Sequence, residues 1–385
     1  MSRSVVIAGS VAQRPGYGGH TWVFLQYLLG FRRLGWDVLF VDRLEPDMCV
    51  DEVGNPCPLE DSVNLQYLLD VLAKSGLEQA YALLYDHGRR VLGLPRTEVV
   101  ERTRRSALLL NVMGFLDDED ILGQAQRRVF LDIDPGFGQM WQALGLHGLF
   151  HGHDDYVTIG QNIGQAECTV PTCGIEWTTT SQPVVLEHWP TRPLVEASFT
   201  SVGSWRGPFA PLEYEGSTYG LRAHEFRRFL EVPRLTGHPF EIALDIDETE
   251  VADLDALRRS GWLLVDARQA AGTPSTYQRF VQDSKGEFMV AKNMYVQSRS
   301  GWFSDRSICY LASGKPVLAQ DTGFAGTYPV GEGLLTFRTV EEAAAGVEEI
   351  SRDYAHHSRA ARALAEGYFD SDKVLSRLLE KLRIA

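Results

Sequence analysis

Apolar runs and amphipathic stretches alternate along the first half of this chain. The runs are apolar at successive positions, which is typical of strands buried on both faces of a parallel sheet. They lie at Val5–Gly9, Val38–Asp42, Ala107–Met113, Arg128–Ile133 and Tyr156–Ile159. Between them, helical patterns occupy Thr21–Leu34, Val63–Lys74 and Asp118–Gln126. Such alternation predicts a parallel sheet covered by helices on both faces.

The alternation stops at Trp177–Val195, a stretch rich in Pro, Thr and Trp that we interpret as an interdomain connection, and then begins again. We predict strands at 198–203, 240–246, 262–265, 287–291, 316–319 and 334–337, with helices at 224–230, 251–259, 276–282 and 307–313. The predicted fold class is therefore α/β, with two Rossmann-like doubly wound domains. We place the first domain at 1–190 and the second at 191–365, and expect 366–385 to form a helix that packs back on the first domain.

Composition and charge exclude several classes of protein. With 44% apolar and 23% charged residues, the 385-residue chain has an ordinary globular composition. Its net charge of −14 argues against binding to nucleic-acid backbone, which needs a basic surface. No apolar stretch is long enough to cross a bilayer. Five cysteines without a CxxC spacing fit a reduced cytoplasm, so we expect a cytoplasmic protein without a zinc site.

The turn Gly18-Gly19-His20 joins the first predicted strand to the first predicted helix. Glycines at such a turn let backbone N–H groups approach a ligand at the start of a helix. His20 would lie in the first helical turn, where burial and the helix dipole oppose protonation of its imidazole. Because a neutral imidazole can accept a proton, His20 is the candidate general base. The alternative is a histidine that only caps or packs the helix.

A second candidate site lies at Ser300–Arg306, directly before a predicted helix. Its glycine allows a backbone turn, and its second serine and its aspartate are typical N-cap residues, after which free N–H groups form an anion site. Positive charge suited to phosphate oxygens comes from Lys292, Arg299 and Arg306. After the next strand, Asp321-Thr322-Gly323 offers acceptors for sugar hydroxyls.

Ser204-Trp205-Arg206 follows the first strand of the second predicted domain. Ligands of such domains bind at the carboxyl ends of the strands, in the cleft between the domains. We therefore expect Trp205 to face the cleft and to be the best candidate among the tryptophans for stacking on a ligand.

The segment SGWFSDRSICYLASGKPVLAQDTG (300–323) resembles the donor-binding segment of GT-B glycosyltransferases. The turn at Gly18-Gly19-His20 is similar to that of the transferase that adds N-acetylglucosamine in peptidoglycan synthesis, and to that of inverting natural-product glycosyltransferases. The resemblance implies two Rossmann-like domains facing across a cleft. It also implies transfer of a sugar, with inversion, from a nucleoside-diphosphate sugar to a small-molecule acceptor, for which we expect a secondary metabolite.

The resemblance further implies roles for individual residues. His20 would deprotonate the acceptor hydroxyl, and Asp132 or Asp134 would orient its imidazole. No metal ion is implied, and no cofactor beyond the nucleotide-sugar as co-substrate. The donor would be bound by Gly18, Gly19, Ser204, Trp205, Arg206, Lys292, Arg299, Gly301, Trp302, Ser304, Asp305, Arg306, Asp321, Thr322 and Gly323.

Two positions depart from known GT-B patterns. Retaining members usually place two glutamates eight positions apart around the donor helix, where this chain has Gly301 and Cys309. Their loss favours inversion. The plant-type donor signature begins with a histidine where this chain has Arg299, which leaves the subfamily open.

Three alternatives stay open on the sequence alone. Asp132-Ile-Asp134 and Asp245-Ile-Asp247 match the DxD of metal-dependent GT-A transferases, although the two-domain pattern argues against that class. A nucleotide-sugar epimerase would share the same architecture. An NAD(P)-dependent oxidoreductase would use Gly16–Gly19 as its dinucleotide turn and Asp42 as its ribose-binding acid. The sugar, the nucleoside, the acceptor's identity and the oligomeric state are not readable from the sequence.

Overall fold

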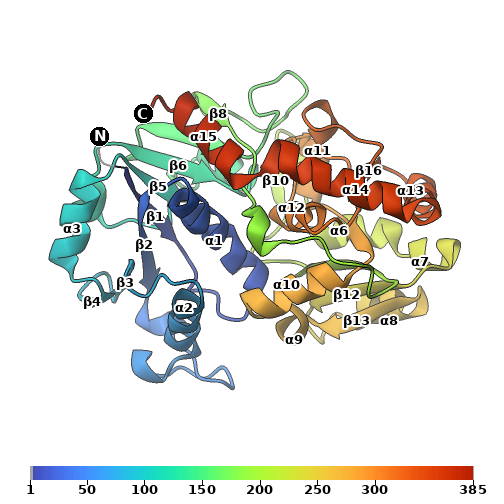
Figure 1. The fold of residues 1–385 in the computed structure, drawn as a ribbon, viewed down its shortest axis with the longest axis horizontal. Coiled ribbons are helices and arrows are strands. Elements are labelled where there is room, and N and C mark those ends of the chain that lie inside the picture. The colour runs from blue at the N-terminus through green and yellow to red at the C-terminus, as the bar shows by residue number, and fades with distance from the viewer. Residues whose placement is uncertain (1–2, 385) are drawn as a thin grey trace.

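The computed structural model describes residues 3–384, which form two α/β lobes on two separate sheets (Figure 1). The first sheet has the order β4-β3-β2-β1-β5-β6-β7-β8, and only the β3–β4 pair is antiparallel. Its strands are β1 (Ser4–Gly9), β2 (Asp37–Leu44), β3 (Tyr81–Tyr85), β4 (Arg90–Gly93), β5 (Leu108–Val112), β6 (Arg128–Asp132), β7 (Asp155–Thr158) and β8 (Trp177–Thr179). Its helices are α1 (Gly18–Arg33), α2 (Val63–Lys74), α3 (Arg96–Arg105), α4 (Glu119–Leu122) and α5 (Phe137–Ala143).

The second sheet is wholly parallel and has the order β13-β12-β9-β14-β15-β16. Counted along the chain, this is the 3-2-1-4-5-6 order of a Rossmann sheet. Its strands are β9 (Phe199–Ser204), β12 (Phe240–Asp245), β13 (Trp262–Asp266), β14 (Gly286–Met289), β15 (Val317–Gln320) and β16 (Leu334–Phe337), and β10 (Leu212–Tyr214) and β11 (Ser217–Tyr219) form a separate hairpin. The predicted α/β class with two Rossmann-like sheets is confirmed.

Helices of the second lobe connect these strands and continue into the C-terminal tail. They are α6 (Arg222–Phe226), α7 (Val232–Thr236), α8 (Val251–Arg259), α9 (Ala267–Ala271), α10 (Pro274–Asp283), α11 (Asn293–Ser298), α12 (Asp305–Ala312), α13 (Val340–Arg352), α14 (Tyr354–Leu364), the π-helical η6 (Ala365–Phe369) and α15 (Ser371–Lys381). Short 3-10 turns lie at Pro46–Met48, Leu59–Asp61, Leu186–His188, Arg227–Phe229 and Phe324–Gly326. No helix among residues 3–384 combines the length and the hydropathy that a membrane span requires.

Several elements of the first lobe differ from the sequence prediction. The prediction missed α3, which buries only Val99 and Thr103 and therefore shows no apolar stripe. It also missed β3, a short run of five residues. In the predicted interdomain connection, Trp177–Thr179 instead forms β8, the edge strand of the first sheet.

The C-terminal helix α15 packs against α1 of the first lobe (Figure 1). A Cβ on Gly30 of α1 would come within 2.7 Å of Leu375, so the absence of a side chain at Gly30 permits this close packing. Arg33 of α1 pairs with Asp372 at 3.0 Å. The tail thus spans from the second lobe back to the first.

The two lobes also meet at the first turn of α1. A Cβ on Gly18 would lie 2.2 Å from the carbonyl oxygen of Thr273 and 2.6 Å from that of Ala271, in the segment that joins α9 to α10. Trp22, one turn later, donates from its indole N–H to the carbonyl of Pro274 at 2.8 Å. Gly18 therefore lets the start of α1 rest on the backbone of the second lobe.

Gly18→Ala should separate the lobes at this contact, because the obstructing atoms are backbone rather than a flexible side chain. We expect a loss of about 1–3 kcal/mol in the free energy of unfolding, the usual effect of overpacking, measured by urea denaturation. Gly367→Ala is the matched control, since nothing lies within 4 Å of a Cβ there. Equal stability of Gly18→Ala and the parent protein would contradict the contact.

Candidate functional site

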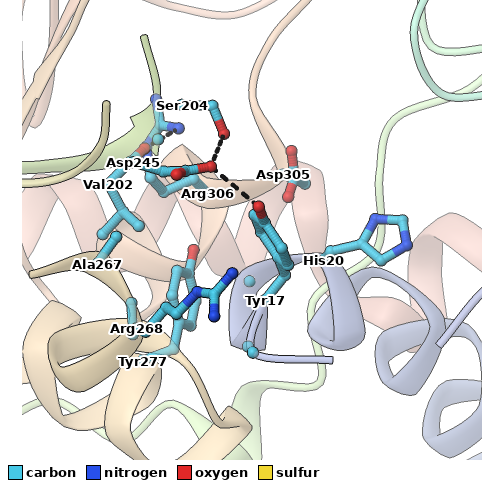
Figure 2. A pocket seen from close by; sticks show the side chains of 15 residues that line it. Tyr17, His20, Val202, Ser204, Asp245, Ala267, Arg268, Tyr277, Asp305 and Arg306 are labelled. Atoms are coloured by element: carbon cyan, nitrogen blue, oxygen red, sulfur yellow. Dashed lines mark hydrogen bonds between the residues drawn. The ribbon is translucent and has the colours of Figure 1, made fainter. Parts of the chain in front are cut away.

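A cavity of about 150 Å³ lies between the lobes, where the turn before α1 faces the carboxyl ends of β9 and β12 (Figure 2). The first lobe contributes Gly16–His20 to its wall. The second lobe contributes residues of β9, β12, α9, α10 and the start of α12. This is the position at which ligands bind in open parallel sheets.

The first turn of α1 presents an uncapped helix N-terminus to this cavity. Tyr17 is the N-cap residue, and its side chain makes no capping hydrogen bond. Gly18, Gly19 and His20 carry first-turn N–H groups and line the cavity. Such groups, together with the positive end of the helix dipole, attract anions.

The imidazole of His20 is held by Ser10 in the loop after β1. Nε2 lies 3.1 Å from the Ser10 carbonyl oxygen and 3.1 Å from its hydroxyl. Since a carbonyl only accepts hydrogen bonds, we assign the proton to Nε2, which leaves a lone pair on Nδ1. Among the described residues, none makes a hydrogen bond to Nδ1. In Figure 2 the imidazole points to the side of the first turn opposite to Tyr17 and Asp245.

The environment of His20 keeps the imidazole neutral. Burial, and to a smaller degree the nearby Arg14 guanidinium, lower its pKa to about 4, although the hydrogen bond to the Ser10 carbonyl acts in the opposite direction. His20 is therefore in the unprotonated form at neutral pH, as a general base requires.

The predicted pairing of His20 with Asp132 is not present in the structure. Asp132 is buried, and it accepts hydrogen bonds from Gln139 at 2.7 Å and from Thr158 at 2.8 Å. Burial raises the pKa of this carboxyl to about 6. The group that orients the imidazole is Ser10, which no sequence signal singled out.

Asp134 is not paired with His20 either, because it makes a contact between the lobes. It accepts from Lys292 Nζ at 2.6 Å and from the hydroxyl of Tyr295. The ammonium group also lies 5.8 Å from the ring centre of Phe137 and 5.6 Å from that of Phe209. Lys292, predicted to bind the donor, thus has its charge neutralised by an aspartate of the first lobe.

Arg306 lines the cavity, but most of its guanidinium is engaged. Nε donates to Glu287 at 2.5 Å, and Nη1 donates to the carbonyl of Val202 at 2.7 Å. Nη2 is buried and has no hydrogen-bond partner among the described residues. Ser304 caps α12 by accepting from the backbone N–H of Arg306 at 3.1 Å, and it is 1% exposed. Of the predicted anion site, Asp305 and Arg306 therefore reach the cavity, and Ser304 does not.

The remaining predicted donor residues of the second lobe pack against the first. Asn162 donates from Nδ2 to the carbonyls of Arg299 at 3.0 Å and Gly323 at 3.2 Å, and its backbone N–H donates to Ser300. A Cβ on Gly301 would lie 2.9 Å from Asn162. These two loops are thus fixed to the first lobe, and none of Lys292, Arg299, Gly301, Trp302, Asp321, Thr322 or Gly323 lines the cavity.

The side chains in those loops have partners of their own. Trp302 stacks on Tyr295 with ring centres 4.2 Å apart, and Thr322 donates to the Trp302 carbonyl at 2.5 Å. Asp321 accepts from Arg338 at 2.5 Å. These contacts account for much of their burial, although the indole N–H of Trp302 and the hydroxyl of Ser300 are buried without a hydrogen-bond partner among the described residues.

Trp205 is a core residue and not a stacking platform. It is 1% exposed, and its indole N–H donates to Asp253 at 2.7 Å. The ring packs edge-on against Phe226. Its neighbour Arg206 pairs with Glu250. Trp205 borders a second cavity of the cleft, but its ring packs in the apolar interior of the second lobe, so the expectation that it stacks on a ligand is wrong.

The cavity residues that the sequence analysis did not name as donor-binding candidates include Tyr17, Asp245 and Arg268. Tyr17 donates from its hydroxyl to Asp245 Oδ2 at 2.9 Å, and Ser204 donates to the same oxygen at 3.1 Å (Figure 2). A second cavity of about 290 Å³ shares Tyr17, Ser204 and Asp245 with the first and continues past Arg206. The hydrogen bond between Tyr17 and Asp245, which we call the Tyr17–Asp245 bridge, thus lies between two chambers of one cleft. Asp245 had a signal, since it is the second-last residue of the predicted strand 240–246.

Asp42 and the DxD motifs gain no support as cofactor or metal ligands. Asp42 is 1% exposed and accepts from the backbone of Ala12 at 2.7 Å, so it is not open to a ribose. Among residues 3–384, the group with the spacing of metal ligands is Glu45, Asp86 and His87, which includes no DxD aspartate.

Glu287→Gln should destabilise the second lobe, since it leaves the Arg306 charge buried without a counterion. We expect a loss of about 3–5 kcal/mol in the free energy of unfolding, measured by urea denaturation. The matched control is Glu101→Gln, which breaks exposed pairs on α3 and should cost less than about 1 kcal/mol. Equal effects of the two variants would show that the buried pair does not anchor α12.

Comparisons with known proteins bear on the fold. No family model matches the chain, and no curated protein sequence does. The structure of HepE of Anabaena in complex with UDP aligns over all of both chains with a TM-score of 0.58 and 13% identity. The pneumococcal O-GlcNAc transferase GtfA, in complex with UDP and GlcNAc, aligns over 99% of this chain and 98% of its own, with a TM-score of 0.56 and 8% identity. Sucrose-phosphate synthase of Thermosynechococcus elongatus aligns over the same shares, with a TM-score of 0.53 and 11% identity. At such identities the likeness is one of architecture, and it shows that this chain has the two-lobed GT-B fold.

Proposed function

We propose that the protein is a glycosyltransferase that moves a sugar from a nucleoside-diphosphate sugar to the hydroxyl group of a small-molecule acceptor. The observation that carries the proposal is the meeting of an uncapped helix N-terminus, arginine side chains and a neutral histidine in one interlobe cleft. The structural relatives support a nucleotide-sugar donor, because HepE was solved with UDP-glucose and GtfA with UDP and GlcNAc.

The diphosphate of the donor would bind at the first turn of α1. The N–H groups of Gly18 and Gly19 supply hydrogen bonds there. Arg268 lines the same cavity and has no ion-pair partner among the described residues. Arg306 adds its free Nη2. This arrangement differs from the one the sequence predicted, since the α1 N-terminus takes the place of the α12 N-terminus, which Ser304 already caps.

Further positive charge lies just behind the cavity wall. A Cβ on Gly203 would lie 2.0 Å from Arg222 Nη1, so this guanidinium directly underlies the turn after β9. Burial and the nearby Arg306 lower the pKa of Arg222 to about 10, which still leaves it charged at neutral pH. Arginine charge placed here would stabilise the negative charge that develops on a departing diphosphate.

His20 would act as the general base through Nδ1. The acceptor hydroxyl attacks the anomeric carbon, its proton passes to Nδ1, and the bond from that carbon to the diphosphate oxygen breaks. The nucleoside diphosphate leaves with the electron pair. One such displacement inverts the anomeric configuration, and it needs no cofactor beyond the sugar nucleotide. We propose a small acceptor of secondary-metabolite type, and the net charge of −14 argues against a nucleic acid as the acceptor.

His20→Ala should abolish most transfer and leave donor binding in place. We expect kcat/KM to fall by about 10²–10⁴-fold, the usual contribution of a general base. The Kd of the nucleoside diphosphate, measured by isothermal titration calorimetry, should change little. His356→Ala is the control, because this histidine is on the surface and pairs with Glu332.

If the His20→Ala variant transferred sugar at the rate of the parent protein, His20 would not be the general base. An anomeric product with the donor's configuration, identified by NMR, would contradict inversion. Formation of a new sugar nucleotide in the absence of acceptor would identify an epimerase instead.

The pH profile of kcat/KM should report the lowered pKa of His20. The base acts only when neutral, so activity should hold as the pH falls from 8 to 5 and decline near pH 4. Circular dichroism at each pH checks that the protein stays folded. An acid limb near the ordinary histidine pKa of about 6.5 would show that the buried imidazole is not the base.

A further inference from the structure

The second sheet places Asp245 at a position with a known chemical use. In the order 3-2-1-4-5-6, β9 is the first strand and β12 the second, and Asp245 is the last residue of β12. In Rossmann sheets an acidic side chain after the second strand accepts hydrogen bonds from ribose hydroxyls, while the phosphates lie at the turn after the first. Here Gly203 and Ser204, the last two residues of β9, line the cavity.

The contacts of Asp245 are those of a hydroxyl-binding carboxylate. Its Oδ2 accepts from two hydroxyl groups, those of Tyr17 at 2.9 Å and Ser204 at 3.1 Å. Its Oδ1 has no hydrogen-bond partner within residues 3–384. No ion pair within that range involves Asp245, so its charge is not already neutralised by a neighbouring base.

The other acidic groups around the cleft differ from Asp245 in their partners or their surroundings. Glu287 pairs with Arg306, and Glu250 pairs with Arg206. Asp305 lies in the first turn of α12, where burial raises its pKa. Asp247 is exposed and lines the second chamber alone, where its Oδ1 accepts from the backbone N–H and the hydroxyl of Thr249 in its own loop. Among the described residues, Asp245 is the carboxylate that lines both chambers and accepts from hydroxyl groups of both lobes.

The space around Asp245 supports the same assignment. Ligand pockets usually measure roughly 300–1,000 Å³, and the chambers of about 150 Å³ and 290 Å³ each fall short of that range. The two chambers meet at the Tyr17–Asp245 bridge, and their combined volume falls within the usual range for ligand pockets. A ligand that displaced the Tyr17 hydroxyl from Asp245 would occupy both chambers, with the diphosphate beside α1 and the base beyond the bridge.

We infer that Asp245 is the specificity residue for the ribose of the donor, and that its carboxylate accepts hydrogen bonds from the 2′ and 3′ hydroxyls. In the absence of a nucleotide, the Tyr17 hydroxyl donates to the same carboxylate. This inference rests on the proposed function. It makes the protein selective for ribonucleoside diphosphates over their deoxy analogues.

Calorimetric titration of the full chain tests the assignment. Uridine, adenosine, guanosine, cytidine and thymidine diphosphates identify the base that binds best, and its ribo, 2′-deoxy and 3′-deoxy forms are then compared. We expect the parent protein to prefer the ribo form by about ten- to hundredfold, the range for hydrogen bonds to a charged group. Asp245→Asn should lose this preference by weakening the ribo form alone. Asp255→Asn, on the exposed face of α8, is the matched control and should keep it.

Tyr17→Phe supplies a second, independent variant. It removes the hydroxyl that competes for Asp245, so the ribo form should bind more tightly than it does to the parent protein. Thermal unfolding of each variant checks that it is folded.

Equal binding of ribo and deoxy forms by the parent protein, or an undiminished preference in Asp245→Asn, would overturn the ribose assignment and leave the proposed donor class standing. Failure of every nucleoside diphosphate to bind the parent protein would overturn both.

Discussion

The close approach of two backbones at Gly18 is the constraint on which the cleft depends. The first turn of α1 lies against the carbonyls of Ala271 and Thr273, a distance that no side chain at position 18 would permit. This contact brings the positive end of a 16-residue helix to the carboxyl ends of the second sheet. Anion-binding N–H groups from one lobe and a Rossmann crevice from the other then share one cavity.

Much of the positive charge around that cavity is structural. The ammonium of Lys292 is matched by Asp134 across the lobes, and Arg306 by Glu287 within the second lobe. A buried charge needs such a partner, because desolvation without one is costly. A basic side chain near a predicted phosphate site can therefore belong to a structural ion pair as readily as it can bind a ligand. Arg268 has no such partner among the described residues, and it is the better candidate for binding phosphate.

The fold could be predicted from local sequence patterns. The site was harder to predict, because the partners of its side chains lie far away in the sequence. Continuous apolar runs identified most strands of both sheets, whereas α3 was missed because its sequence RTEVVERTRR buries so little. Gly18, Gly19 and His20 line the cavity as the first residues of α1, close to β1 in the sequence, so a local pattern was enough to single them out. The partner of His20 could not be inferred, because the choice between Asp132, Asp134 and Ser10 depends on how β1 and β6 are spaced in the folded sheet. Asp245 was noticed only as half of a DxD match, although its place after the second strand of the second lobe carried the stronger information.

Asn162 of the first lobe fixes two loops of the second lobe through their main-chain atoms. Its side-chain amide donates hydrogen bonds to the carbonyl oxygens of Arg299 and Gly323, and every residue type has such an oxygen. These contacts do not involve the side chain of Arg299, which lies 4.0 Å from Asp321 and whose backbone has a left-handed φ of 51°. A Cβ at Gly301 or Gly323, in contrast, would collide with Asn162. The relative position of the two lobes is thus fixed here by main-chain atoms and by the absence of side chains at two glycines.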